Sequence, residues 1–154
     1  MFNIISFSSE KLDAKSFGYG KVYELSKVKG NIVNVKTTAE SEQHKGKKTL
    51  IVVESYEYDE GSIKVIADKK KACYLIDLSK IINSYGTRRA MEMAKLRSFL
   101  KVCNRFGAFY TFADFARNEL DLRRAKELEH IALLLGINQG QAKFALQMLK
   151  EYLD

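Results

Sequence analysis

The chain is almost continuously apolar at residues 49–55, TLIVVES. These side chains do not alternate between apolar and polar, as they do in a strand that has one face in water. The run therefore predicts a β-strand that is covered on both faces, which is the usual condition of a parallel sheet flanked by helices. We expect the residues on either side to supply further strands and the helices that cover them.

Further strands are expected before and after this run, where β-branched and aromatic residues gather. The candidates are FNIISF at 2–7, NIVNVK at 31–36, SIKVIA at 62–67, ACYLIDL at 72–78 and AFYTFA at 108–113. Between the strands, residues 19–28 (YGKVYELSKV) predict a short helix with Val22 and Leu25 on one side. Residues 37–48 predict a polar loop, and residues 68–71 predict a basic turn.

The second half of the chain predicts a long amphipathic helix over residues 87–106. Thr87 is a suitable N-cap, and Gly107 is placed to end the helix. One side of the helix carries apolar residues three or four positions apart, which is the spacing of a face that packs on a core. These residues are Met93, Leu96, Phe99, Leu100, Cys103 and Phe106.

Two more helices are expected after residue 120. The first opens at Asp121 and closes at Gly136, and the second begins after Asn138, which forms a capping-box pattern with Gln141. Their inward faces are formed by Leu128, Ile131, Ala132 and Leu135 in the first and by Ala142, Ala145, Leu146 and Leu149 in the second.

Strands that alternate with helices indicate an α/β fold with a mainly parallel sheet and a helical C-terminal half. The 154 residues suit one domain, 1–154. A complete barrel of βα units needs about 250 residues, or at least about 200. We therefore expect a reduced or incomplete TIM-barrel-like fold.

The composition, with 46% hydrophobic and 29% charged residues, is typical of a globular protein. No apolar run approaches the roughly 20 residues of a membrane span, and the first residues lack the basic and apolar regions of a signal peptide. Cys73 and Cys103 have no metal-binding or redox spacing and are expected to be reduced core residues. These features predict a cytoplasmic protein with no membrane contact.

The common catalytic patterns are absent from the sequence. His44 and His130 are too few for a histidine-rich metal site, and there is no phosphate-binding glycine loop or nucleophile elbow. We therefore expect no catalytic residue and no resident metal. One alternative stays open, because Glu54, Asp77 and Asp114 each fall near the carboxyl end of a predicted strand. There they could hold Mg²⁺ in a compact metal-dependent nuclease, or simply cap turns and pair with lysines.

The formal net charge is +7, and all seven arginines lie in the second half of the chain. Arg97, Lys101 and Arg105 are four positions apart, so they form one stripe on the predicted long helix, away from its apolar face. Arg88 and Arg89 fall in the first turn of that helix, where free backbone N–H groups favour phosphate. The pattern favours contact with nucleic acid over its two alternatives, an acidic protein partner and plain solubility.

Two segments of the second half resemble a known family. They are YLIDLSKIINSYGTRRAMEMAKLRSFLKVCNRFGAFYTFADF at 74–115 and LDLRRAKELEHIALLLGINQGQAKFAL at 120–146. In this order they resemble the C-terminal part of ribonuclease P protein component 3, the archaeal and eukaryotic TIM-barrel-like subunit of the enzyme that processes the 5′ ends of tRNA. The resemblance covers about half of the chain, and its strongest part is LLLGINQGQAKFAL at 133–146.

The resemblance implies a protein subunit of ribonuclease P that has no active site of its own. Family members bind the catalytic RNA, meet precursor tRNA only indirectly, and pair with component 2, a small α/β protein, in a heterotetramer. Cleavage belongs to the RNA and its Mg²⁺ ions, so no cofactor is expected on this chain. The RNA-binding candidates are Arg88, Arg89, Arg97, Lys101, Arg105, Arg123 and Arg124.

Overall fold

Every strand of the molecule runs parallel to the strands with which it pairs. The computed structural model describes residues 1–154 and places the strands in two sheets, one with the order β3-β4-β5-β6 and one formed by β1 and β2. A parallel bridge between Ile5 and Ala116 places β1 beside the chain that follows β6. The strands are β1 (Phe2–Ile5), β2 (Lys21–Glu24), β3 (Ile32–Val35), β4 (Leu50–Val53), β5 (Cys73–Asp77) and β6 (Tyr110–Ala113).

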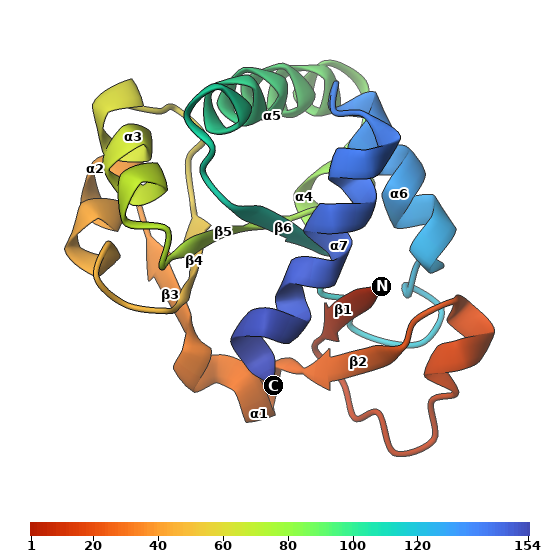
Figure 1. The fold of residues 1–154 in the computed structure, drawn as a ribbon. Coiled ribbons are helices and arrows are strands. Elements are labelled where there is room, and N and C mark those ends of the chain that lie inside the picture. The colour runs from red at the N-terminus through yellow and green to blue at the C-terminus, as the bar shows by residue number, and fades with distance from the viewer.

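Helices connect and cover these strands (Figure 1). The α-helices are α1 (Leu25–Val28), α2 (Thr38–Ser41), α3 (Glu60–Lys69), α4 (Ser79–Ile82), α5 (Gly86–Phe106), α6 (Ala125–Leu134) and α7 (Gln139–Leu153). Three 3-10 turns are η1 (Ala14–Phe17), η2 (Lys29–Asn31) and η3 (Glu42–His44). No helix combines the length and the apolar character that crossing a membrane requires. The predicted α/β class with a helical second half is confirmed.

One face of the sheet packs against α3 and α5. Tyr74 and Ile76 of β5 and Phe112 of β6 belong to the core cluster on this face, and all three are buried. The ring of Phe99 in α5 meets the ring of Tyr74 edge-on, with 5.1 Å between the centroids. Burying one such side chain contributes about 1.5–3 kcal/mol to stability. The apolar face predicted for the long helix is therefore what attaches α5 to the sheet.

The opposite face of the sheet is covered by α7, which crosses β6 and β1 in Figure 1. Cys73 and Leu75 point to this face and pack in a second core cluster with Leu149 of α7. Thr111 Oγ1 in β6 donates a hydrogen bond of 2.7 Å to the carbonyl oxygen of Ala145. Because helices lie on both faces of the sheet, three of the four residues of β4 are buried and Val52 is half-buried, which accounts for the apolar run of this strand.

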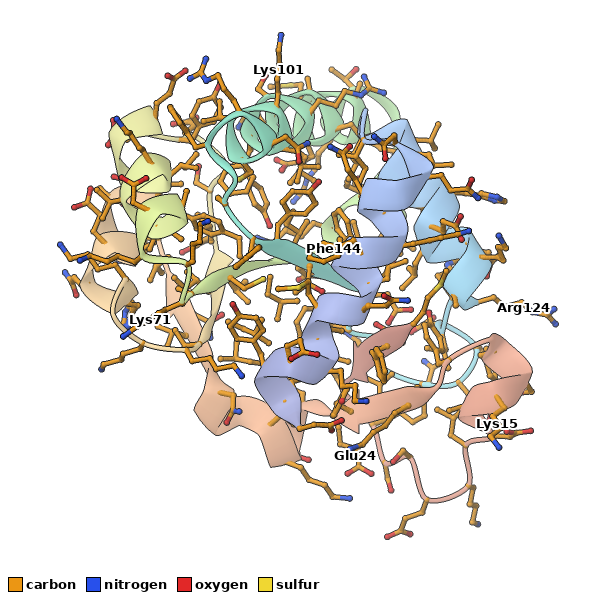
Figure 2. All side chains as sticks on the ribbon, viewed as in Figure 1. Lys15, Glu24, Lys71, Lys101, Arg124 and Phe144 are labelled. Carbon is orange, nitrogen blue, oxygen red and sulfur yellow. The ribbon has the colours of Figure 1, made fainter.

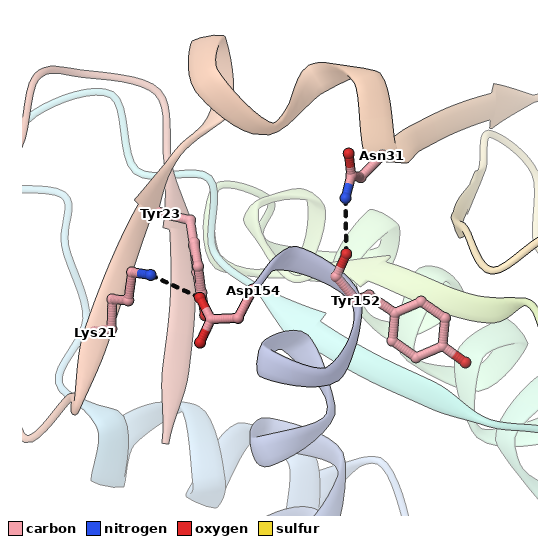
Figure 3. A network of polar contacts seen from close by, with 5 residues as sticks. All are labelled: Lys21, Tyr23, Asn31, Tyr152 and Asp154. Atoms are coloured by element: carbon pink, nitrogen blue, oxygen red, sulfur yellow. Dashed lines mark hydrogen bonds and ion pairs between the residues drawn. The ribbon is translucent and has the colours of Figure 1, made fainter.

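The sheet does not close into a barrel, because β2 and β3 are its outer strands. The end of α7 ties these two strands together instead (Figure 3). Asp154 Oδ1 accepts hydrogen bonds from Lys21 Nζ at 2.6 Å and from Tyr23 OH at 2.8 Å, both in β2. Next to β3, Asn31 Nδ2 donates to the carbonyl oxygen of Tyr152 at 2.8 Å. The reduced TIM-barrel-like architecture predicted from the chain length is confirmed.

The prediction of a strand at residues 62–67 is wrong, because this segment belongs to helix α3. Asp59 caps the helix by accepting a hydrogen bond of 3.0 Å from the amide of Ser62. Ile63 and Ile66, three positions apart, are both buried. The parallel neighbours β4 and β5 need a crossover between them, which α3 supplies. The β-branched residues that suggested a strand therefore pack as one face of a helix.

Three short segments also differ from their predictions. Residues 19–28 form strand β2 before the single turn α1, because Lys21–Glu24 pair in register with β1. Residues 37–48 are not a plain loop but contain α2 and η3, and Thr38 Oγ1 there accepts a hydrogen bond of 2.8 Å from the N-cap residue of α3. At residues 68–71 the predicted turn is confirmed in part, because Asp68 and Lys69 end α3 and Lys70 forms a left-handed turn. The conformations of the first two segments depend on partners elsewhere in the chain.

The predicted boundary of α5 is confirmed at its C-terminal end. Gly107 follows the helix with a left-handed backbone at φ 77°, a conformation that glycine adopts without strain, as predicted. At the other end, the helix starts at Gly86 with Tyr85 as its N-cap, so the assignment of Thr87 as the N-cap is wrong. No side chain satisfies the first amides of this helix.

The two helices after residue 120 also agree in part. Asp121 does not open α6; it accepts a hydrogen bond from Asn118 Nδ2 at 3.0 Å in the preceding turn, and the helix begins at Ala125. The predicted capping box of α7 is confirmed in both directions. The amide of Gln141 donates to Asn138 Oδ1 at 2.8 Å, and the amide of Asn138 donates to Gln141 Oε1 at 2.9 Å.

Candidate nucleic-acid interface

The basic stripe, defined as Arg97, Lys101 and Arg105, lies on the exposed side of α5. All three residues are exposed, whereas Leu96 and Leu100 on the other side of the helix are buried. Figure 2 shows Lys101 pointing away from the body of the molecule. The four-residue spacing thus places these charges in water as predicted. Their contact with RNA stays a prediction.

The two arginines of the basic stripe also serve the fold. Arg97 Nε donates a hydrogen bond of 2.9 Å to the carbonyl oxygen of Leu134 at the end of α6. Arg105 forms an ion pair with Glu60 at the start of α3. Lys101 has no such partner within the chain. A guanidinium has five N–H donors, so Arg97 keeps several of them free for a phosphate group.

The two arginines at the start of α5 have different surroundings. Arg89 donates from Nε to the carbonyl oxygen of Ile81 at 3.1 Å and from Nη2 to that of Ile82 at 3.2 Å. These bonds connect the first turn of α5 to the carbonyl groups at the end of α4. Arg88 is exposed and makes no such bond. Of the two, Arg88 alone keeps its whole guanidinium group available.

A buried carboxylate fixes the turn before α6. Asp114 accepts hydrogen bonds from Asn3 Nδ2 at 2.9 Å and from the amide of Ala116 at 3.1 Å. It also accepts one of 3.0 Å from the amide of Arg123. Burial raises the pKa of Asp114, while these hydrogen bonds act in the opposite direction. Because the backbone is held here, the exposed Arg124 projects from a defined point of the surface (Figure 2).

A groove of about 360 Å³ between α5 and α6 brings two of the predicted residues together. Arg89 and Arg123, which are 34 positions apart in the sequence, both line it. Glu127 is the acid on its wall, and the remaining lining residues are Ile81, Ile82, Met93, His130, Ile131 and Leu134. Arg97 of the basic stripe adjoins this groove, because it bonds to the carbonyl oxygen of Leu134, which also lines it. The groove therefore brings predicted residues of α5 and of the turn before α6 close to one another.

The carboxylates of the nuclease alternative do not assemble into a site. Glu54 is exposed, Asp77 accepts a hydrogen bond of 2.9 Å from the amide of Ser79, and Asp114 is occupied by the network described above. No group of three or more histidine, cysteine, aspartate or glutamate side chains gathers anywhere in the molecule. The prediction that these three carboxylates meet in one metal site is therefore wrong.

Both cysteines are free and buried, as predicted. Burial is the main cause that raises the pKa of the Cys73 thiol and the pKa of the Cys103 thiol. A thiol that stays protonated is a poor nucleophile and a poor metal ligand. The two cysteines are therefore part of the core.

Sequence reasoning missed two cations that line a cleft of about 640 Å³. Arg117 follows β6 and Lys29 precedes β3, and both line this cleft together with Asp77 and the half-buried ring of Phe115. Phe115 has a left-handed backbone at φ 48°, which is unusual for an aromatic residue. The signal for Arg117 was its place shortly after β6, at the edge where functional groups of α/β sheets gather. Lys29 has no comparable signal.

No family model matches the chain. Ribonuclease P protein component 3 of Archaeoglobus fulgidus is 28% identical over 102 residues, which cover 66% of this chain and 51% of that protein. The resemblance to component 3 is confirmed. The chain spans about half the length of this curated relative.

A solved structure shares the fold over the whole chain. It is a chain of the cryo-EM structure of archaeal ribonuclease P with mature tRNA, with a TM-score of 0.67 and 17% sequence identity. The superposition covers 100% of this chain and 79% of that one. At this identity the likeness establishes the fold, and it agrees with the reduced TIM-barrel-like architecture described above.

Proposed function

We propose that this chain is a non-catalytic protein subunit of ribonuclease P. In this role it supports RNA-catalysed removal of the 5′ leader from precursor tRNA by binding the catalytic RNA and a partner protein. The observation that carries the proposal is the sequence similarity to component 3 over 66% of the chain. The fold shared with a chain of archaeal ribonuclease P supports it over the remaining residues.

The surface charge supports an RNA partner. The net charge is +7, and arginine is suited to phosphate because its planar group offers paired N–H donors. Arg88, Lys101 and Arg124 are exposed and have no acidic partner within the chain. The proposed RNA contacts are Arg88, Arg89, Arg97, Lys101, Arg105, Arg123 and Arg124. In this proposal Mg²⁺ serves the RNA, and this chain contributes no ligand to it.

The proposed protein partner is component 2, in a heterotetramer of the two proteins. The support is the open sheet, because β2 and β3 each leave one side without a neighbouring strand. Exposed strand edges are usually paired or covered in natural proteins. We also propose a cytoplasmic location, where buried reduced thiols such as Cys73 and Cys103 are the norm.

Recovery of the tagged protein from its own cells, followed by sequencing of the bound RNA, tests the proposal. Ribonuclease P RNA should be the enriched species, and component 2 should be recovered with it. A reconstituted mixture of that RNA, component 2 and this chain should cleave precursor tRNA at lower Mg²⁺ than the RNA alone, because bound cations screen phosphates that Mg²⁺ must otherwise screen. Recovery without ribonuclease P RNA, combined with an unchanged Mg²⁺ requirement, would overturn the proposal.

A further inference from the structure

Two lysine-rich segments that are distant in sequence lie side by side at the amino ends of β4 and β5. The register pairs Leu50 with Cys73, and the amide of Cys73 donates to the carbonyl oxygen of Thr49 at 3.0 Å. The residues that precede the two strands are therefore neighbours as well. We call their lysines the lysine edge, which consists of Lys45, Lys47, Lys48, Lys69, Lys70 and Lys71.

All six side chains of the lysine edge are exposed, and none takes part in an ion pair. Most other lysines of the chain are unpaired too, so the feature that sets the lysine edge apart is the density of its charges: six lysines gather where Asp68 and Glu151 are the neighbouring acids. Like charges that outnumber the acids around them repel one another, and a polyanion would relieve this repulsion. The lysine edge thus differs from an ordinary solvated face, on which charges of both signs are mixed more evenly.

A groove of about 460 Å³ runs between the lysine edge and α7. Its cationic wall is formed by Lys48, Lys70 and Lys71, and Glu151 is the acid that lines it. The backbone of the groove is held in place, because Tyr152 OH donates to the carbonyl oxygen of Lys71 at 2.9 Å. In Figure 2, Lys71 lies on a different part of the surface from Lys101, so the lysine edge is separate from the basic stripe.

The backbone at Lys70 is strained in a way that shapes this groove. Lys70 closes α3 with φ 49°, in the left-handed region where glycine or asparagine is usual. A lysine in this conformation has a higher conformational free energy than a glycine would have, and strained residues of this kind concentrate at functional positions. The left-handed turn directs the chain from α3 into β5, and so it places Lys70 and Lys71 opposite Lys48.

We propose that the lysine edge binds the sugar–phosphate backbone of RNA, as a second contact surface apart from the basic stripe. The inference rests on the proposed function for the identity of the polyanion. Lysine ammonium groups are mobile point charges that suit phosphates in varied positions. The ring of Tyr152 beside them is 7% exposed, so it is not available for stacking on a base. The lysine edge therefore recognises charge along a backbone and does not read sequence.

The double variant Lys48→Gln with Lys71→Gln tests the proposal against a matched control. Lys11→Gln with Lys15→Gln removes the same charge from exposed residues on another part of the surface, where Figure 2 shows Lys15, and both variants carry a net charge of +5 (7 − 2). The probe is a fluorescently labelled RNA hairpin, titrated at several salt concentrations. The slope of log affinity against log salt should become shallower by roughly 1.4–1.8 in the first variant, for two phosphate contacts of about 0.7–0.9 each. It should stay near the original value in the control.

Equal slopes in the two variants would overturn the proposal. Thermal melting of both variants shows whether they fold, and little change is expected because none of these side chains forms an ion pair; Lys48 loses only its contact with the ring of Tyr152, whose centroid lies 5.7 Å from Nζ. Acetylation of lysines with and without the hairpin, read by mass spectrometry, separates the remaining outcomes. Protection of the lysine edge and not of Lys11 and Lys15 supports the inference. Protection of Lys101 alone from acetylation would contradict the inference and leave the proposed function standing. The absence of protection at both surfaces would contradict the inference and the proposed function.

Discussion

The basic stripe and the lysine edge both present positive charge, but they are built in different ways. In the basic stripe, Arg97 is bonded to a helix carbonyl group and Arg105 to a carboxylate, so two of its three cations also hold elements of the fold together. In the lysine edge, no side chain has an acidic partner. At these two surfaces the residue types therefore have different roles: the arginines of the basic stripe support the fold and carry charge, whereas the lysines of the lysine edge supply mainly charge. Substitutions should therefore affect stability at one surface and only binding at the other.

The largest loss of stability is expected when Asp114, which fixes the turn that carries Arg123 and Arg124, is replaced. Asp114→Ala removes the acceptor for Asn3 Nδ2 and for the amides of Ala116 and Arg123. Buried donors left without a partner cost about 1–3 kcal/mol each, so we expect the free energy of unfolding to fall by about 3 kcal/mol. Urea denaturation followed by circular dichroism measures this loss. Asp77→Asn is the control, since Asp77 is half-buried and caps one amide; equal losses in both variants would show that the Asp114 network is not special.

The second prediction concerns the affinity for RNA when the charges of the basic stripe are removed. Alanine at Arg97, Lys101 and Arg105 together should make the salt dependence of RNA affinity shallower by two to three contacts, at roughly 0.7–0.9 log units per contact. The measurement is the hairpin titration used for the lysine edge. An unchanged slope removes the stripe from the RNA interface, and the lysine edge would then carry the binding. Equal changes at both surfaces mean that RNA touches both.

The smallest expected effect is a difference in stability between two single variants within the basic stripe. Arg97→Ala loses the bond to the carbonyl oxygen of Leu134 and should lower the free energy of unfolding by about 0.5–1.5 kcal/mol. Lys101→Ala, one helical turn away and without a partner, should stay within about 0.5 kcal/mol of the unchanged protein. Thermal or urea unfolding of the two single variants decides the matter. A loss at Lys101 as large as that at Arg97 would contradict the division of work between the two residue types.

The features predicted correctly from the sequence depend on local signals. The continuous apolar run of β4, the glycine after α5 and the capping box of Asn138 with Gln141 are each complete within a few residues. The exposure of the basic stripe follows from helix periodicity in the same way. What these features share is that no distant part of the chain is needed to recognise them.

The features that were missed depend on distant partners. The segment at 62–67 contains strand-favouring residues, yet it is a helix because β4 and β5 run parallel and need a crossover. Strand β2 exists because β1 pairs with it. The bond from Arg97 to α6 and the neighbouring loops of the lysine edge arise from packing and strand register, and neither is visible in a window of sequence. The predicted convergence of Glu54, Asp77 and Asp114 was wrong for the same reason, since strand ends alone do not say which side chains meet.

The tie between the end of α7 and the outer strands has a consequence for how the chain folds. The contact of Lys21 with Asp154 joins residues 133 positions apart, and that of Asn31 with Tyr152 joins residues 121 positions apart. Two strands alone form a marginal sheet, so β1 and β2 gain their stability from docking on β6 and α7. Contacts of such long range slow the search for the native state, because the intervening chain must be ordered first. The small sheet should accordingly form late, after the transition state, and its mutations should speed unfolding while leaving the folding rate almost unchanged.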